Sequence, residues 1–367
     1  MKIVYASQIF AEQEFGGISR YICALASQMS RFPGVQSKIV APLHINGYLK
    51  DLGSDIAVGC YVRRLPKTAR IIKTLSTALC GPIAGMMRPD IVHETYYAER
   101  PLCRNQVPHA LTVYDMIHER FPASFAIEDP VARLKKYAVN RVDHIFCISE
   151  NTRRDLLDIH NIPVDRVTVT YLGCDALPRS GLKAGALVGA GPYILYVAGR
   201  HGYKNFEGLV RAFGASAWLK DSFRIVCFGG SAFSPTERSL MTELGLSDTQ
   251  VLQMGGGDDR LAALYRGAAA FVYPSKYEGF GIPPLEAMSL DCPVICSNTS
   301  SIPEVVGDAG EYFDPFDPES IRSAIERVLQ SSERRAELIS LGRSRCKRFT
   351  WERCAQETLD VYRRLAA

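Results

Sequence analysis

Two glutamates stand on either side of a glycine-containing turn in the stretch YEGFGIPPLEAM. Glu278 precedes the turn. Glu286, eight positions after Glu278, lies in the first turn of a helix that is expected to begin near Pro283. The helix dipole favours a carboxylate there, and such a carboxylate can accept hydrogen bonds from the two hydroxyl groups of a ribose. The spacing alone is equally typical of a tight turn followed by a helix-capping glutamate.

The backbone between these glutamates has the features of an anion site. Gly279 and Gly281 let the main chain approach a ligand closely, and the N–H groups of Phe280, Gly281 and Ile282 lie at the expected start of the helix. A phosphate cradle beside two hydroxyl acceptors describes a site for a nucleotide sugar.

Two cations are expected at the same site. Arg200 and Lys204 follow the strand-like run YILYVAG, which opens the second half of the chain. Cations at the start of a helix oppose its dipole, which disfavours the alternative of ordinary solvated charges. Together they could neutralise a diphosphate as it leaves.

The elements that must position these residues alternate between strands and helices. Apolar runs typical of parallel strands covered on both faces are KIVYAS, SKIVAP, DIVHE, ALTVYDM, HIFCISE and RVTVTYLG in the first half, and YILYVAG, FRIVCFGG, VLQMGG, AFVYPS and PVICSN in the second. A helix is expected from Gly17 to about Arg31, and Ser149 is expected to cap another. This pattern predicts an α/β protein with two Rossmann-like, doubly wound parallel-sheet domains. Ligands of such sheets bind beyond the carboxyl ends of the strands, so we expect the site in a cleft between two facing domains.

The domain boundaries follow from a stretch rich in Gly, Ala and Pro that lacks periodicity. Residues 1–178 are predicted to form an acceptor-side domain, residues 179–192 a linker, and residues 193–349 the donor-binding domain. The final stretch, 350–367, reads as an amphipathic helix that packs back on the first domain.

Composition excludes several classes of protein. The 367 residues are 47% apolar, and the net charge of +4 is too small to indicate a nucleic-acid partner. No apolar run is long enough to cross a membrane, and the first ten residues lack the features of a secretory signal. The 11 cysteines are scattered singly, as is typical of reduced thiols, so we expect a cytoplasmic protein.

At this point the motifs resemble those of a known family. EGFGIPPLE is similar to the E-x7-E motif of retaining glycosyltransferases of family 4, which have the GT-B fold. GRHGYKN resembles the Arg/Lys motif that binds the donor phosphates in that family. FGGISRYICAL resembles the family's N-terminal Gly-Gly loop and first helix. The resemblance covers nearly the whole chain and is most specific in its second half. It implies transfer of a hexose from a nucleoside-diphosphate sugar to a saccharide or lipid-linked saccharide acceptor, with retention of configuration by front-face attack and without an enzyme nucleophile.

The resemblance also implies roles for individual residues of the second domain. Glu286 would hold the ribose, and Glu278 would contact the transferred sugar. Arg200 and Lys204 would bind the diphosphate and stabilise it as the leaving group.

In the first domain the resemblance places Gly16 and Gly17 near the donor phosphates. Many family members carry a His-Asp pair after the strand that corresponds to ALTV, and this chain has Tyr114-Asp115 instead. The departure leaves the role of that histidine open. Tyr114 could hydrogen-bond a sugar hydroxyl, and His118, four positions on, has either a catalytic or a structural role.

The chain contains no D-x-D triplet, the pattern by which other glycosyltransferases hold a metal–diphosphate complex. We therefore expect neither a metal nor another cofactor, because the nucleotide sugar is itself a substrate.

A basic segment at residues 63–75 suggests a second kind of partner. It places Ile71, Ile72 and Leu75 beside a set of cations: Arg63, Arg64, Lys67, Arg70 and Lys73. A basic amphipathic helix can lie on an anionic bilayer, and many family members act on lipid-linked acceptors. We expect weak peripheral contact with the inner face of the cytoplasmic membrane, with an ordinary half-buried helix as the alternative.

The donor and the exact activity stay open at the level of sequence. The likeness of GRHGYKNF and SNTSSIPEVVGDAG to bacterial mannosyltransferase-like enzymes of surface polysaccharide synthesis favours GDP-mannose or a related GDP-sugar, and O-antigen, capsule or exopolysaccharide as the product. The alternatives are a nucleotide-sugar epimerase of GT-B-like fold and a non-catalytic nucleotide-sugar-binding protein. A dehydrogenase is disfavoured because no G-x-G-x-x-G follows the first strand.

Overall fold

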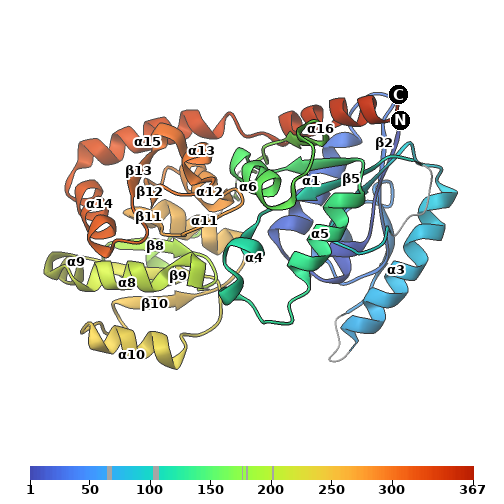
Figure 1. Cartoon of the computed structure of the whole chain (residues 1–367). Helices are drawn as coiled ribbons and strands as arrows, with labels where there is room; N and C mark the ends of the chain where they lie inside the picture. Colours follow the sequence, from blue (N-terminus) through green and yellow to red (C-terminus); the bar gives the residue numbers. More distant parts are fainter. Residues whose placement is uncertain (64–67, 102–106, 176, 179–180, 201) are drawn as a thin grey trace. The chain divides into compact units, whose positions relative to one another are not determined.

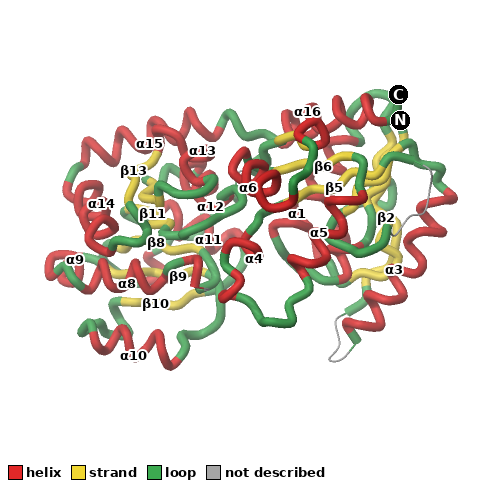
Figure 2. The backbone as a smooth tube through the Cα atoms, viewed as in Figure 1, coloured by secondary structure: helices red, strands yellow, loops and turns green. Residues whose placement is uncertain are grey.

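The chain forms two compact units in a computed structural model that describes residues 1–63, 68–101, 107–175, 177–178, 181–200 and 202–367. Unit 1 comprises Met1–Gly173 together with Thr350–Ala367, and unit 2 comprises Cys174–Phe349. Each unit is built around one parallel sheet flanked by helices (Figure 1, Figure 2). The predicted α/β class with two Rossmann-like domains is thus confirmed.

Unit 1 contains a seven-stranded sheet in the order β3-β2-β1-β4-β5-β6-β7, with every neighbouring pair parallel. Its strands are β1 (Lys2–Tyr5), β2 (Gln36–His44), β3 (Ala57–Tyr61), β4 (Ile91–Glu94), β5 (His109–Val113), β6 (His144–Cys147) and β7 (Val167–Val169). The strand β3 was not predicted, because it lies at the sheet edge and is largely exposed, so it lacks the apolar run of a buried strand.

The helices of unit 1 follow the strands in alternation. They are α1 (Gly17–Met29), α2 (Gly47–Asp51), α3 (Ala69–Met86), α4 (Ile117–Arg120), α5 (Val131–Arg141), α6 (Glu150–His160) and α16 (Trp351–Leu365), with 3-10 turns at Gln8–Ala11, Pro122–Ser124 and Val164–Arg166. The predicted cap of α6 is confirmed: the Ser149 hydroxyl accepts the N–H of Thr152 at 3.0 Å.

Alternate residues of the unit 1 strands support opposite faces of the sheet. Val4 and Val92 pack with Cys80 and Ala84 of α3 on one face. On the other face, the buried ring of His93 contacts Tyr362 of the C-terminal helix α16. Helix α16 also packs against α1, so the chain end belongs to unit 1.

Unit 2 contains a six-stranded parallel sheet in the order β10-β9-β8-β11-β12-β13. Its strands are β8 (Tyr193–Val197), β9 (Arg224–Phe228), β10 (Val251–Met254), β11 (Ala270–Tyr273), β12 (Val294–Ser297) and β13 (Gly310–Phe313). The sequence did not predict β13, which has only two fully buried positions and begins with a glycine.

The helices of unit 2 pack on this sheet, in part around a large apolar cluster. They are α7 (Gly185–Val188), α8 (Phe206–Gly214), α9 (Ala217–Ser222), α10 (Pro235–Glu243), α11 (Asp258–Gly267), α12 (Ile282–Ser289), α13 (Ile302–Val306), α14 (Pro318–Gln330) and α15 (Ser332–Cys346), with 3-10 turns at Gly202–Lys204 and Gly307–Ala309. The core joins residues of α8, α10 and α14 to the strands, while α12 packs against α15. These contacts fix the loops at the carboxyl ends of the strands, where the candidate site lies.

Candidate functional site

The turn between β11 and α12 is held by two serines of the segment before α13. The Ser301 hydroxyl lies 2.9 Å from the carbonyl oxygen of Glu278 and 2.8 Å from that of Phe280. The Ser300 hydroxyl accepts the N–H of Glu278 at 2.9 Å. The turn predicted to contact a ligand is therefore fixed in shape by its neighbours.

Glu286 lies in the second turn of α12, which corrects the prediction that it lies in the first. Gly281 has φ 113°, in the region that favours glycine, and the helix begins at Ile282. The Glu286 side chain is buried, and one of its carboxylate oxygens lies 3.4 Å from the Tyr265 hydroxyl. Burial and then the charge of Glu286 raise the pKa of Tyr265, so this hydroxyl stays protonated and donates to the carboxylate.

Glu278 forms an ion pair with Lys204. The Lys204 Nζ lies 2.7 Å from Oε1 and 2.9 Å from Oε2, and the two side chains are 18% and 9% exposed. The hydroxyl of Tyr273 is a second partner of the carboxylate, and burial followed by the charge of Glu278 raises the pKa of Tyr273. The structure thus joins a cation from the loop after β8 to a carboxylate from the loop after β11.

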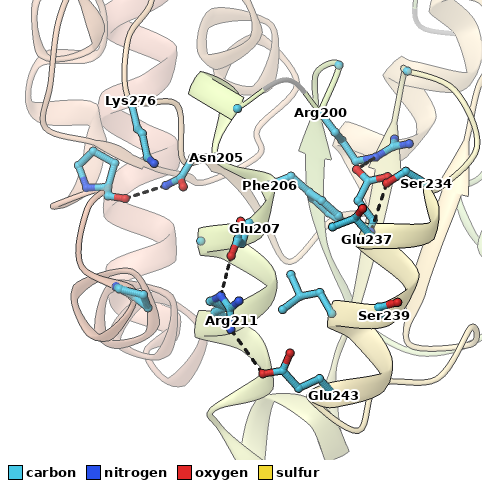
Figure 3. Close-up of a pocket in the computed structure, with 18 of the residues that line it drawn as sticks. Arg200, Asn205, Phe206, Glu207, Arg211, Ser234, Glu237, Ser239, Glu243 and Lys276 are labelled. Carbon is cyan, nitrogen blue, oxygen red and sulfur yellow. Dashed lines mark hydrogen bonds and ion pairs between the residues drawn. The ribbon is translucent and has the colours of Figure 1, made fainter. Parts of the chain in front are cut away.

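Arg200, the other predicted cation, has a separate set of partners (Figure 3). Its Nε donates to Glu237 Oε1 at 2.7 Å, and one terminal nitrogen donates to Gln253 Oε1 at 2.6 Å. Glu237 also accepts the N–H of Ser234 at 2.6 Å, which completes a capping box at the start of α10. Burial raises the pKa of Glu237, but hydrogen bonds from Ser234 and Arg200 outweigh it and the net pKa is lowered.

Sequence reasoning missed both Glu237 and Gln253. The Ser-x-x-Glu spacing of the capping box was a usable signal for the position of Glu237 at a helix start. Gln253 sits in an apolar strand run, and nothing in the sequence indicates that it accepts a hydrogen bond from an arginine 53 positions away.

A hollow of about 860 Å³ lies beside Arg200 in unit 2. Figure 3 shows it between α8 and α10, lined by Phe206, Glu207, Arg211, Glu237 and others. The side chains that the sequence motifs singled out, Glu278, Glu286 and Lys204, do not line it. We therefore treat this hollow as separate from the turn predicted to bind the nucleotide sugar.

The two glycines of unit 1 that were predicted to lie near the donor phosphates are at the start of α1. Gly16 is the residue before the helix and Gly17 is its first residue. A Cβ placed on Gly17 would meet nothing within 4 Å, so the backbone is open to close approach there.

Tyr114 and Asp115, at the end of β5, are engaged within unit 1. The buried Tyr114 hydroxyl donates to the carbonyl oxygen of Thr95 at 3.0 Å. Asp115 Oδ1 accepts the N–H of Ile117 at 3.1 Å. The Tyr114 hydroxyl and the Asp115 carboxylate, which the sequence suggested as contacts for the acceptor saccharide, thus form hydrogen bonds within unit 1.

His118 stacks on Phe125 at 3.8 Å, and its Nε2 lies 3.7 Å from Asp129 Oδ2. Burial and then the charge of Lys135 lower the pKa of His118, so the ring is neutral at pH 7. A neutral imidazole packed on an aromatic ring is compatible with the structural role that the sequence left open.

Lys135 organises the same region and was not predicted. Its side chain is 0% exposed, and its Nζ donates to the carbonyl oxygen of Asp115 and to Glu119 Oε2, both at 2.8 Å. The ammonium also lies 5.3 Å from the centre of the Tyr97 ring. A lysine in a charged helical stretch gives no sequence signal of complete burial, because burial depends on the partners that the fold brings to it.

Helix α3 carries apolar side chains on two faces. Ile72, Cys80 and Ala84 are buried, and Cys80 and Ala84 pack against the sheet. An outer stripe, hereafter the α3 stripe, is exposed and consists of Ile71 (60%), Leu75 (47%), Leu79 (46%) and Met86 (76%). Of the basic residues predicted to flank it, Arg64 and Lys67 lie outside the described residues.

Two absences hold for the part of the chain that the structure describes. No three His, Cys, Asp or Glu side chains gather there into a group that could hold a metal ion. No described helix is both long and apolar enough to span a bilayer.

Comparison with known proteins places each half of the chain in a family. Residues 15–176 match the family described as Glycosyltransferase Family 4, and residues 183–345 match Glycosyl transferases group 1. The two matches correspond to the bulk of unit 1 and unit 2.

Individual relatives are similar over part of their length. The O-antigen chain mannosyltransferase B of Escherichia coli is 35% identical over 231 residues, 60% of this chain and 60% of that protein. The O-antigen chain mannosyltransferase RfbU of Salmonella typhimurium is 28% identical over 63% of this chain and 62% of its own length. The chain thus spans about three fifths of either relative.

Among solved structures, the sucrose-phosphate synthase of Thermosynechococcus elongatus has a TM-score of 0.75 over 99% of this chain and 98% of its own. At 18% identity this likeness shows the fold alone, the GT-B fold of two Rossmann-like domains.

Proposed function

Because the chain belongs to the glycosyltransferases that join a family 4 domain to a group 1 domain, we propose that it is a retaining hexosyltransferase. Its donor is a nucleoside-diphosphate sugar, for which GDP-mannose is our first choice. Its acceptor is a glycan or lipid-linked saccharide of bacterial surface polysaccharide synthesis, such as O-antigen. The names of the two O-antigen mannosyltransferase relatives support this choice of sugar and pathway.

The observation that carries the proposal is the Lys204–Glu278 pair, with Glu286 in the helix that follows Glu278. Lys204 follows β8, and Glu278 and Glu286 follow β11, which is the neighbour of β8 in the sheet. Ligands of parallel α/β sheets bind at the carboxyl ends of the strands, where both loops lie. A cation, a hydroxyl-accepting carboxylate and a second carboxylate there match the phosphate, the sugar and the ribose of the proposed donor.

In the proposed reaction the protein binds and orients charge rather than attacking the sugar. The bond from the anomeric carbon to the diphosphate oxygen breaks, and the electron pair leaves with the diphosphate, next to Lys204. The acceptor hydroxyl forms the new bond on the same face and passes its proton to the leaving phosphate oxygen. Glu278, held by Lys204 and Tyr273, accepts a hydrogen bond from a hydroxyl of the transferred hexose, and Glu286 accepts from the ribose.

A thermal-shift panel of GDP-, UDP-, dTDP- and ADP-sugars tests the donor. A ligand at 100 times its Kd adds about 2.7 kcal/mol of stability to the protein that binds it. We expect the largest shift with GDP-mannose. A larger shift with another sugar nucleotide changes the donor assignment, and no shift with any of them contradicts the proposed site.

Transfer itself is tested with Lys204→Ala. Loss of one leaving-group contact costs about 3 kcal/mol, or ~100-fold in turnover. The control is Lys347→Ala, which removes an exposed lysine at the end of α15 in the same unit. Near-wild-type transfer by Lys204→Ala would remove Lys204 from the site. Product without transfer, such as a changed donor sugar, would indicate the epimerase alternative, and binding without any product would indicate the non-catalytic one.

Retention and metal independence are separate parts of the proposal. The anomeric proton coupling in the NMR spectrum of the product reports the configuration at the transferred carbon. Transfer measured after dialysis against EDTA should equal transfer with added divalent metal. Inversion in the first experiment, or restoration by metal in the second, would overturn the corresponding part.

We further propose that the α3 stripe rests on an anionic bilayer surface as a peripheral contact of a cytoplasmic enzyme. The stripe stands at helical spacing on the exposed side of α3. The surrounding sequence from residue 56 to residue 89 contains no Asp or Glu, and its charged residues are all basic: Arg63, Arg64, Lys67, Arg70, Lys73 and Arg88. Lys73 pairs with Glu12, and the remaining cations keep this stretch basic. An apolar stripe in a basic stretch of sequence fits a surface of anionic headgroups above acyl chains.

Co-sedimentation with vesicles tests this contact. We expect binding to vesicles of phosphatidylglycerol and phosphatidylcholine at low salt, and weaker binding to phosphatidylcholine alone. Leu75→Glu with Leu79→Glu should abolish it. Thr74→Glu with Thr77→Glu, at two exposed positions outside the stripe, is the charge-matched control. Equal pelleting of all variants, or none by the wild type at low salt, rules the contact out.

A further inference from the structure

Each of the five N–H groups of the Arg200 guanidinium has an acceptor within unit 2. Nε donates to Glu237 at 2.7 Å. One terminal nitrogen donates to Gln253 Oε1 at 2.6 Å and to the carbonyl oxygen of Gly229 at 3.4 Å. The other donates to the carbonyl oxygens of Ser231 and of Ala232, the latter at 3.1 Å. An arginine has five such donors and no more, so none is left for a phosphate.

The surroundings of the guanidinium also hold it in place. The Arg200 side chain is 5% exposed. Its guanidinium carbon lies 4.7 Å from the ring centre of Phe233 and 5.7 Å from that of Phe206, the latter visible in Figure 3. Turning Arg200 toward a bound diphosphate would break the ion pair, the carbonyl contacts and both ring contacts together.

Apart from Glu237 in α10, the hydrogen bonds of Arg200 join residues at three adjacent strands. Arg200 follows β8, the carbonyl groups belong to the loop after β9, and Gln253 lies in β10, in a sheet ordered β10-β9-β8. Gln253 closes the network, because its Nε2 donates to the Gly229 carbonyl at 2.8 Å. Such support matters for this loop, since Gly229 and Gly230 have φ 92° and 75°, and a glycine loses more conformational freedom on ordering than any other residue.

We infer that Arg200 is a positioning residue that fixes the loop Gly229–Ala232 at the donor-binding end of unit 2, and that Lys204, not Arg200, contacts the diphosphate. This inference rests on the proposed function, because the loop ends where a donor would bind. The fork geometry of arginine is what joins the acceptors, and a lysine of equal charge has only three donors at one point and cannot reach them together.

Steady-state kinetics with the preferred donor distinguish positioning from direct contact. Ordering a loosened loop is a cost of donor binding, so Arg200→Lys should raise the donor KM about tenfold and leave kcat within about threefold. Gln253→Ala, which removes the neighbouring acceptor and touches no phosphate, should give a similar change. The double variant should be no worse than Arg200→Lys alone, because both act through one loop. A ~100-fold loss of kcat in Arg200→Lys, with Gln253→Ala like the wild type, would assign Arg200 to the leaving group and overturn the inference.

Amide hydrogen exchange in the donor-free protein gives a readout that does not depend on catalysis. Exchange of residues 229–233 should be at least tenfold faster in Arg200→Lys and in Gln253→Ala than in the wild type. The control is Arg238→Lys in α10, whose side chain is 54% exposed and contacts Asp248 at 3.5 Å. Unchanged exchange in Arg200→Lys overturns the inference even if the enzyme is a glycosyltransferase. Faster exchange in a protein that binds no nucleotide sugar keeps the loop-fixing role and shows that the proposed function has failed.

Discussion

Removing the Lys204 cation is expected to destabilise unit 2, because it leaves the mostly buried Glu278 carboxylate without its ion-pair partner. The two side chains are 18% and 9% exposed and share contacts of 2.7 and 2.9 Å. Breaking a fully buried pair costs about 3–5 kcal/mol, and a hydrogen bond to a charged group contributes about 1.5–3 kcal/mol. Because Lys204 is partly solvated, we take about 2 kcal/mol for Lys204→Met. A domain of this size then melts about 4–8 °C lower.

A double-mutant cycle isolates this pair from other effects of the substitutions. Lys204→Met, Glu278→Gln and the double variant are unfolded in urea, and their free energies of unfolding are compared with that of the wild type. The double variant should lose about 1–2 kcal/mol less than the sum of the single losses, because the second substitution removes the charge that the first left unpaired.

An exposed ion pair of the same unit serves as the control for the cycle. Arg238 and Asp248 are 3.5 Å apart, with side chains 54% and 87% exposed. Their cycle, with Arg238→Met and Asp248→Asn, should give a coupling below about 0.5 kcal/mol. Additive losses at Lys204 and Glu278, no larger in coupling than this control, would refute the ion pair and with it the geometry on which the donor site rests.

Three further predictions concern other parts of the chain. Burial lowers the pKa of His93 to about 3, so below about pH 6.5 the unfolded chain binds a proton that the folded chain does not. The free energy of unfolding should therefore fall as the pH drops from 6.5 toward 3, by up to about 1.4 kcal/mol per pH unit. His93→Gln should flatten this slope, measured by urea unfolding at pH 7 and pH 5. An unchanged slope in that variant counts against a neutral buried His93. Gly281→Ala should lower the free energy of unfolding by about 1–2 kcal/mol, because φ at this position is 113°. Gly17→Ala, with open space around the added Cβ, should change it by less than about 0.5 kcal/mol. Equal effects in thermal unfolding would contradict the backbone described for the β11–α12 turn. Tyr114→Phe removes the hydroxyl that donates to the Thr95 carbonyl oxygen, so it should cost about 1–2 kcal/mol of stability. The rate of sugar transfer should stay within about threefold of the wild-type rate. A ~100-fold loss of transfer at unchanged stability would instead show that Tyr114 contacts the acceptor saccharide.

Most strands of the fold were readable from the sequence because the central strands of both sheets are buried on both faces. Strands such as β5 (HALTV) and β11 (AFVY) are buried at every position, so each appears as a continuous apolar run. The two strands that were missed are β3 and β13, each at the edge of its sheet. The edge strands β7 and β10 were predicted, so position at the edge is not sufficient to hide a strand. β3 is largely exposed and β13 has only two buried positions, so neither appears as a continuous apolar run.

Part of the candidate site could also be predicted from the sequence and part could not. The sequence located the β11–α12 turn and its two glutamates, because glycines and prolines mark a turn into a helix locally. It placed Glu286 one turn too early, since the exact residue at which a helix begins depends on the packing and hydrogen bonds of the preceding turn.

What the sequence determined by itself is the class of the fold, its two-domain plan and the short motifs at strand ends, all of which are set by residues close together in the chain. What only the tertiary structure decided is which charge pairs with which. Glu278 lies 74 positions from Lys204, and Glu237 and Gln253 lie 37 and 53 positions from Arg200. Two cations four positions apart look equivalent in the sequence, but their roles depend on acceptors that only the folded sheet brings beside them, because hydrogen bonds act over about 3 Å of space whatever the distance along the chain.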